Sequence, residues 1–147
     1  MYKHILIPTD GSDLSRASAL HGVKLAKALG AKVTAFFAAP PATPMVYNGF
    51  LPTGYGTTTE HATIIEKVAA KYLAVIEKAC AAAGVPCVSV HETNEFAAEA
   101  IMALAKKRKC DLIFMASHGR RGLSEMLLGS QTHKVLTHSK IPVLVYR

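Results

Sequence analysis

The residues best suited to chemistry lie in one glycine-rich segment, MASHGRRGLSEMLLGSQ, which runs from Met115 to Gln131. It contains Gly119, Gly122 and Gly129, and Ser130 follows the last of them. Glycine lets backbone N–H groups approach phosphate oxygens, and the start of a helix adds partial positive charge. The Ser130 hydroxyl could donate to a phosphate or cap a helix. The spacing therefore leaves two alternatives open: a phosphate-binding loop, or a strand-to-helix connection that uses glycine for turn geometry.

A second candidate is the sequence PTDGS, from Pro8 to Ser12, which directly follows the first apolar run. The Asp10 carboxylate could accept hydrogen bonds from ribose hydroxyls, although Asp-Gly-Ser before a helix is also an ordinary turn. Within the glycine-rich segment, His118 could donate to a phosphate or form a hydrogen bond that only stabilises the loop. The two segments together are suited to binding a nucleotide.

Several kinds of catalytic site are absent from the sequence. It contains no G-x-x-x-x-G-K-[ST] and no G-x-G-x-x-G after the first strand, which argues against a P-loop ATPase and a dinucleotide cofactor. The seven histidines show no metal-ligand spacing, and no G-x-S-x-G elbow or general base is evident. We therefore expect binding without efficient turnover, no catalytic residue and no metal site.

Composition limits the class of protein further. The chain has 147 residues, half of them apolar, which suits one globular domain over residues 1–147. No apolar run approaches the ~20 residues of a membrane span. The apolar run at the N-terminus is interrupted by Pro8 and Asp10, which makes it too short for a secretory signal. The three cysteines show no paired spacing, as in reduced proteins. The sequence therefore predicts a cytoplasmic protein that does not enter the membrane.

The net charge of +7 raises the question of an anionic partner. Part of the excess lies in KKRK, residues 106–109, at the end of a helical pattern. Cations at a helix C-terminus offset the negative end of the helix dipole. The run also lacks the aromatic residues on which nucleic-acid bases stack. We therefore interpret it as a helix end and do not expect nucleic-acid binding.

The apolar runs predict five short strands. They are rich in β-branched or aromatic residues and mostly lack strict alternation, which suits parallel strands covered on both faces. The expected strands are KHILIP (3–8), AKVTAFFA (31–38), PCVSVH (86–91), DLIFMA (111–116) and PVLVY (142–146).

Four helices are expected between these strands. The first begins after Ser12, a good N-cap, and ends at Gly30. Its inward-facing residues should be Ser18, Gly22, Leu25 and Leu29. The second covers about residues 61–83, and its inward-facing residues should be Ile65, Ala69, Tyr72, Ile76 and Cys80. The third begins after Asn94, and its inward-facing residues should be Ala97, Ile101 and Leu104. A short fourth follows Gly129.

Strands and helices thus alternate along the whole chain. With right-handed crossovers, this order predicts an α/β domain with a doubly wound parallel sheet. In the common five-stranded order the first strand is central, and the order reverses between the first and fourth strands. PTDGS follows the first strand and ASHGRRG continues from the end of the fourth, so both candidate segments should face one crevice.

Two further features concern covering and assembly. The irregular segment Ala39–Glu60 could be a lid, with Tyr47, Phe50 or Tyr55 over a bound base, or a disordered surface loop. The last strand, Pro142–Tyr146, reads as an apolar edge. Pairing with the same strand of a second, two-fold-related copy would satisfy the unpaired backbone N–H and C=O groups of this edge, so we expect a homodimer.

The sequence resembles the universal stress protein family along essentially its whole length. The resemblance rests on the opening ILIPTDGS, the alternating elements, the segment CDLIFMASHGRRGLSEMLLGS and the ending IPVLVYR. The family's nucleotide signature is G-x2-G-x9-G-[ST]. Gly119, Gly129 and Ser130 occupy its second glycine, third glycine and hydroxyl position, whereas Ala116 stands at the first glycine.

The resemblance implies a Rossmann-like domain that binds ATP, or ADP or AMP, and forms a cytoplasmic homodimer linked to stress responses. Mg²⁺ could accompany the nucleotide. The resemblance also implies that Asp10 contacts the ribose and that the backbone around Ala38 contacts the adenine. Gly119 and residues 129–131 would hold the phosphates. Alternatives are a nucleotide-free interaction module of the same fold and a slow ATP hydrolase. The candidate binding residues are Pro8, Thr9, Asp10, Ala38, Ala116, His118, Gly119, Arg120, Gly122, Gly129, Ser130 and Gln131.

Overall fold

The computed structural model of the protein describes residues 1–42, 58–120 and 128–147. Within these ranges, strands and helices alternate in the order expected from the sequence. The elements are β1 (His4–Pro8), α1 (Asp13–Leu29), β2 (Lys32–Ala39), α3 (Thr58–Ala83), β3 (Cys87–Thr93), α4 (Ala97–Lys107), β4 (Leu112–Ala116), α5 (Ser130–His138) and β5 (Val143–Tyr146).

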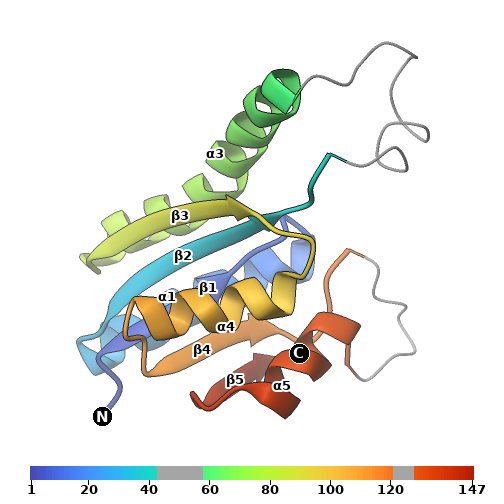
Figure 1. The fold of residues 1–147 in the computed structure, drawn as a ribbon. Helices are drawn as coiled ribbons and strands as arrows, with labels where there is room; N and C mark the ends of the chain where they lie inside the picture. Colours follow the sequence, from blue (N-terminus) through green and yellow to red (C-terminus); the bar gives the residue numbers. More distant parts are fainter. Residues whose placement is uncertain (43–57, 121–127) are drawn as a thin grey trace.

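The strands form one five-stranded sheet with the order β3-β2-β1-β4-β5, and all neighbouring pairs are parallel (Figure 1). In the central pair, His4 lies opposite Lys32 and Pro8 opposite Phe36. The chain moves from β1 to β2 on one side and later returns to β4 on the other side. The reversal of strand order between β1 and β4 is therefore confirmed, and so is the predicted α/β class.

Helices cover both faces of the sheet (Figure 1). Ile5 and Ile7 of β1 belong to the apolar core beneath α1 and α3. Leu6, between them, belongs to the core beneath α4 and α5. A central strand buried on both faces explains why its sequence is continuously apolar, as the sequence predicted. The edge strands β3 and β5 depart from that expectation, because Val88 and Leu144 are 51% and 39% exposed.

The ends of α1 follow from local signals. The Ser12 side chain accepts a hydrogen bond from the Ser15 N–H, and Gly30 adopts the left-handed conformation with φ of 61°. The buried face differs in part from the predicted one. Leu25 and Leu29 are only half-buried, whereas Ser15 and Val23 are buried. The cause is tertiary: a Cβ added at Gly22 would lie 2.8 Å from Ile7 of β1, and the next residue, Val23, belongs to the same buried core.

The later helices depart from the sequence expectations mainly at their ends. The helix expected from about residue 61 begins at Thr58, and the one expected after Asn94 begins at Ala97. The Asn94 side chain instead accepts from the Phe96 N–H, which forms a turn before the helix. The inward face expected for α3 is buried except at Tyr72, which is half-buried.

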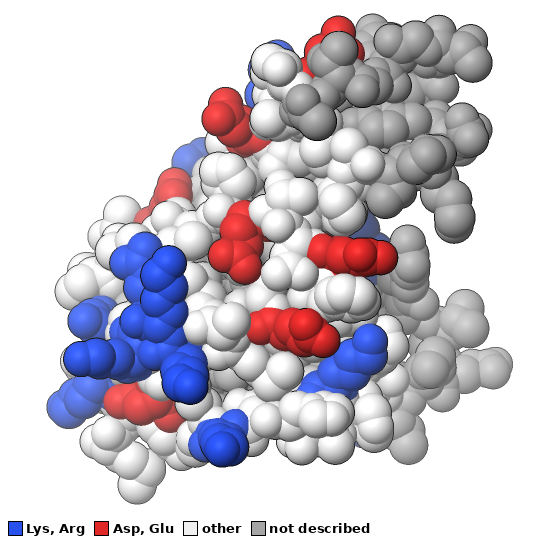
Figure 2. Space-filling view, viewed as in Figure 1, with Lys and Arg blue, Asp and Glu red and all other residues white. Residues whose placement is uncertain are grey.

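The basic run 106–109 lies at the end of α4, as interpreted from the sequence. Lys106 and Lys107 are in its last turn, and Arg108 is the C-cap residue. Figure 2 shows Lys and Arg side chains gathered at this end of the molecule. Because α4 runs antiparallel to the strands, these cations lie at the amino ends of the strands, away from the edge where β1 and β4 end.

Two sequence predictions concern segments at the margins of the described structure. The residues proposed as a lid, Tyr47, Phe50 and Tyr55, lie outside the described ranges. The last strand begins at Val143 rather than Pro142, whose carbonyl accepts from the Ile113 N–H.

Within the described residues, no helix combines the length and apolar character needed to cross a membrane.

His4, at the start of β1, gives a test of the fold through pH. The ring is buried, and its Nε2 lies 2.8 Å from the Thr34 Oγ1. Burial lowers the pKa of His4 below its ordinary 6.5, and Lys32 lowers it further, whereas Asp111 opposes the shift. The unfolded chain therefore takes up the proton first as the pH falls.

We expect the contribution of His4 to stability to be complete above pH 6.5 and to be lost as the pH falls below that value. The measurement is the free energy of unfolding by urea between about pH 8 and about pH 5, for the unaltered protein and His4→Gln. The difference between them should shrink toward acid pH. A constant difference would show that His4 does not titrate differently on folding.

Candidate functional site

A cavity of about 440 Å³ lies at the carboxyl ends of β1 and β4, where the strand order reverses. Ligands of open α/β sheets bind at such a position. Gly122 lies outside the described residues. All other candidate residues from the sequence line the cavity: Pro8, Thr9, Asp10, Ala38, Ala116, His118, Gly119, Arg120, Gly129, Ser130 and Gln131.

Other lining residues were not identified from the sequence. Ala97 and Ile101, from the first turns of α4, and Met115 of β4 form an apolar part of the wall. The helical pattern identified Ala97 and Ile101 only as inward-facing. Which of those residues reach the crevice depends on where α4 crosses the sheet, and no local signal gives that position. The remaining lining residues are Ser15, Glu95 and Thr132.

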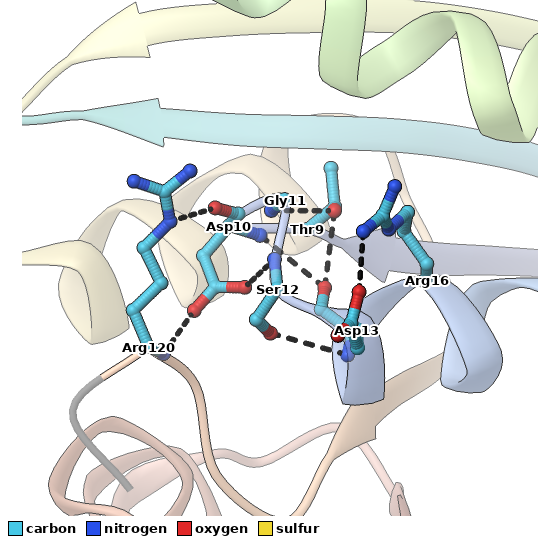
Figure 3. A network of polar contacts seen from close by, with 8 residues as sticks. Thr9, Asp10, Gly11, Ser12, Asp13, Arg16 and Arg120 are labelled. Carbon is cyan, nitrogen blue, oxygen red and sulfur yellow. Dashed lines mark hydrogen bonds and ion pairs between the residues drawn. The ribbon is translucent and has the colours of Figure 1, made fainter.

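The Asp10 carboxylate joins the two candidate segments (Figure 3). Its Oδ1 accepts from the Ser12 N–H at 2.9 Å, so the turn inferred as one alternative does form. Its Oδ2 accepts from the backbone N–H of Arg120 at 2.8 Å. In return, the Arg120 Nε donates to the Asp10 carbonyl at 3.0 Å. The loop after β1 is therefore tied to the loop after β4 at the mouth of the cavity.

Gly119 is needed for this contact. A Cβ at this position would lie 2.1 Å from the Asp10 Oδ2, which is far inside van der Waals contact. The absence of a side chain lets the carboxylate approach the backbone and accept from Arg120. Gly119 thus shapes the site through Asp10, a role that the phosphate-based interpretation of the glycine did not include.

Gly129 also permits a close backbone approach. A Cβ there would lie 3.0 Å from the His118 Cα, and the Gly129 N–H donates to the Ser117 carbonyl at 2.7 Å. Its φ of −70° is ordinary, so left-handed geometry is not the reason for glycine. Gly129 is itself the N-cap residue of α5 and Ser130 is the first helical residue. The alternative in which Ser130 caps the helix is therefore wrong.

The first turn of α5 presents hydrogen-bond donors to the cavity. The N–H groups of residues 130–132 have no acceptor within the helix, whereas the His133 N–H bonds to the Gly129 carbonyl. The Ser130 side chain forms no hydrogen bond with the described part of the chain. These donors and the positive end of the helix dipole can bind an anionic group.

The side chains beside these donors fix the position of α5. The Gln131 Oε1 accepts from the Ala98 N–H at 3.0 Å, which satisfies a donor in the first turn of α4. The Thr132 Oγ1 donates to the Ala116 carbonyl at 2.9 Å. The N-terminus of α5 is thereby held against both α4 and the end of β4, so its donors are pre-positioned.

Ala116 ends β4 in extended conformation. Among the described non-glycine residues, only Lys109 has a positive φ. Alanine is therefore unstrained at the position of the first signature glycine, and its methyl group only narrows the cavity. The interpretation that this position continues the strand is confirmed.

Among the described residues, the titratable side chains that line the cavity are those of Asp10, Glu95, His118 and Arg120. The His118 Nδ1 lies 3.2 Å from the Ser117 Oγ, which matches the loop-stabilising alternative and leaves Nε2 for another partner. The Cys80 and Cys110 thiols do not line this cavity; burial raises the pKa of Cys80 to about 12 and that of Cys110 to about 11, so both stay protonated. The described ranges contain no group of three or more residues suited to holding a metal ion.

Comparison with known proteins agrees with this geometry. The model of the universal stress protein family matches residues 1–147. The chain is 33% identical over 147 residues to universal stress protein MJ0531 of Methanocaldococcus jannaschii, covering all of this chain and 83% of that protein. It is 32% identical over 149 residues to universal stress protein YxiE of Bacillus subtilis, covering all of both chains.

Solved structures share the fold. Protein MJ0577 of Methanocaldococcus jannaschii superposes with a TM-score of 0.78 at 28% identity, over 99% of this chain and 95% of that chain. A universal stress protein in complex with cAMP gives 0.69 at 22% identity, over 99% and 97%. A universal stress protein from Archaeoglobus fulgidus in complex with dAMP gives 0.65 at 15% identity, over 99% and 98%. The family match along the whole chain and the relatives of comparable length show that this chain belongs to the universal stress protein family.

Proposed function

We propose that the protein binds ATP, or the related ADP or AMP, in the cavity between the ends of β1 and β4. The observation that carries this proposal is the convergence of three features on one cavity. These are the Asp10 carboxylate, the N–H groups in the first turn of α5 that have no acceptor within the helix, and the hydroxyl of Ser130. A nucleotide needs acceptors for its ribose hydroxyls and donors for its phosphates, and this cavity offers both.

The proposed orientation follows from the chemistry of the walls. The phosphates bind at Gly119, Gly129 and the first turn of α5, and the ribose binds at Asp10. The adenine lies beside the backbone at Ala38 and against the apolar wall formed by Ala97, Ile101 and Met115. Mg²⁺ accompanies the phosphates from solvent, since no carboxylate cluster among the described residues would hold it. The structures of related fold in complex with cAMP and dAMP support an adenine nucleotide as the ligand class.

The wider role that we propose is a single-domain cytoplasmic protein, without efficient enzymatic activity, that acts in the stress response as a homodimer through β5. Bound nucleotide would bias its interactions with partners. The family match supports the stress role. The competing function is a nucleotide-free interaction module of the same fold, and a slow ATP hydrolase is the third possibility.

Titration of ATP into nucleotide-free protein tests the binding proposal, with Ala116→Gly as the informative variant. Because Ala116 is unstrained and lines the cavity, removing its methyl group widens the site without changing the strand. We expect measurable binding by the unaltered protein and binding about threefold to tenfold tighter by Ala116→Gly, which corresponds to relieving one methyl contact.

The control is Asp10→Ala, which removes the proposed ribose acceptor and should weaken binding in either background. Turnover measured with the same variants distinguishes binding from hydrolysis. If neither the unaltered protein nor Ala116→Gly binds ATP at about millimolar concentration, the proposal fails and the interaction-module alternative replaces it.

A further inference from the structure

A positive charge at the rim of the cavity is held by α3, an element that contributes none of the candidate binding residues. The side chain of Arg120 runs from the loop after β4 past Asp10 toward α3 (Figure 3). Its Nε donates to the Asp10 carbonyl at 3.0 Å, and its Cζ lies 5.0 Å from the centroid of the Tyr72 ring. At this distance the guanidinium is in a cation–π contact with the ring.

The Tyr72 ring is itself firmly placed. It packs edge-to-face on Phe37 of β2, with ring centroids 5.1 Å apart and an interplanar angle of 84°. It also covers Gly11, where an added Cβ would lie 2.3 Å from the ring. Contacts with β2, with the loop after β1 and with Arg120 leave the ring little freedom to move. The surface that it offers to the guanidinium is therefore pre-organised.

The guanidinium keeps most of its hydrogen-bonding capacity. Within the described part of the chain, only the Asp10 carbonyl accepts from it, through Nε. The Asp10 carboxylate accepts from the backbone N–H of Arg120, and no acidic side chain in the described ranges forms an ion pair with the guanidinium. The cation–π contact uses none of the guanidinium N–H groups as donors to an oxygen, so those other than Nε–H stay available for planar contact with phosphate.

We propose that Tyr72 is a positioning residue that holds the Arg120 guanidinium, which forms no ion pair within the described residues, at the cavity, so that affinity rises with the charge of the phosphate chain. This inference rests on the proposed nucleotide function and adds selectivity for ATP over AMP. The two sources of positive potential, Arg120 and the N-terminus of α5, line one cavity. A triphosphate can use both at once, whereas a monophosphate carries too little charge and length to do so.

The test is calorimetric titration of AMP and ATP into nucleotide-free protein, with the ratio of the two dissociation constants as the readout. A general structural defect weakens both ligands alike and leaves this ratio unchanged. We expect the unaltered protein to prefer ATP by at least about tenfold. Arg120→Gln should reduce the preference about tenfold, while Arg120→Lys, which keeps the charge, should retain part of it.

Tyr72→Leu should reduce the preference about threefold, because it removes the cation–π contact. Tyr72→Phe is the matched control, since it keeps the ring and should preserve the preference. Circular dichroism and thermal unfolding of each variant identify any that fail to fold. For a misfolded Tyr72→Leu, Tyr72→Met provides a second ring-free variant with closer side-chain volume.

The outcomes separate this inference from the proposed function. Equal affinity of the unaltered protein for AMP and ATP would leave the nucleotide function standing and overturn this inference. An unchanged ratio in Arg120→Gln, or equal weakening of both ligands by loss of the Tyr72 ring, would also overturn it. Absence of binding by any adenine nucleotide would overturn both.

Discussion

Gly119→Ala is expected to lower the affinity for ATP by about 100-fold. The added Cβ would lie 2.1 Å from the Asp10 Oδ2, so the carboxylate must move away from the loop. It then loses its hydrogen bond to the Arg120 N–H and its proposed alignment with the ribose. Loss of charge-assisted hydrogen bonds costs roughly 1.5–3 kcal/mol, and displacement of the neighbouring loop brings the total to about 3 kcal/mol.

The measurement is calorimetric titration of ATP, and Gly30→Ala is the matched control. Gly30 has a φ of 61° and no atom within 4 Å of an added Cβ, so its replacement costs roughly 1 kcal/mol of stability without touching the cavity. Gly30→Ala should bind ATP like the unaltered protein. If Gly119→Ala also binds within about threefold of the unaltered protein, Asp10 is not held for the ribose in the way we propose.

The fold could be predicted from local signals because those signals act over a few residues. Ser12 and Gly30 mark the ends of α1 by capping and by left-handed geometry, and both are confirmed. The continuous apolar runs predicted strands of a parallel sheet covered on both faces, which holds for the buried β1 and β4. The alternation of strands and helices then left few topologies, and the common one placed the strand-order reversal between β1 and β4, as observed.

Features that depend on how elements meet could not be predicted in the same way. Helical periodicity defines an apolar face only to within about a residue, so Leu25 was placed inward where Val23 is buried. The edge position of β5 was predicted and is observed, but no local signal shows that β3 forms the other edge or that Val88 and Leu144 are exposed. Edge position is a property of the sheet, and the strand sequences alone do not contain it.

The candidate site shows the same division. Its glycines and Ser130 were found because their types are unusual and their spacing is short. The function of Gly119 was not found, because the atom it makes room for belongs to Asp10, far away in the sequence. Ile101 and Tyr72 reach the site or its rim from helices, where an apolar or aromatic residue at helical spacing looks like any core residue.

Leu144→Lys is expected to convert the proposed dimer into a monomer, raising its dissociation constant at least about 100-fold. β5 is an edge strand, and Leu144 is 39% exposed in the isolated chain. Burying a lysine ammonium without a partner at an apolar interface costs several kcal/mol. Because the two β5 strands pair about a two-fold axis, the interface would contain one such lysine from each subunit. Leu144 is chosen instead of Val143 because Val143 is half-buried and packs on the core beneath α4 and α5. A substitution at Leu144 should therefore preserve the fold of the monomer.

The measurement is sedimentation equilibrium at about micromolar protein, with Val88→Lys as the matched control. Val88 is an apolar residue on the opposite edge strand, β3, and is 51% exposed, so the same substitution there adds the same charge to an edge that we do not propose to pair. It should leave the dimer intact. A monomeric unaltered protein, a Leu144→Lys variant that remains dimeric, or equal dissociation of both variants would contradict dimerisation through β5.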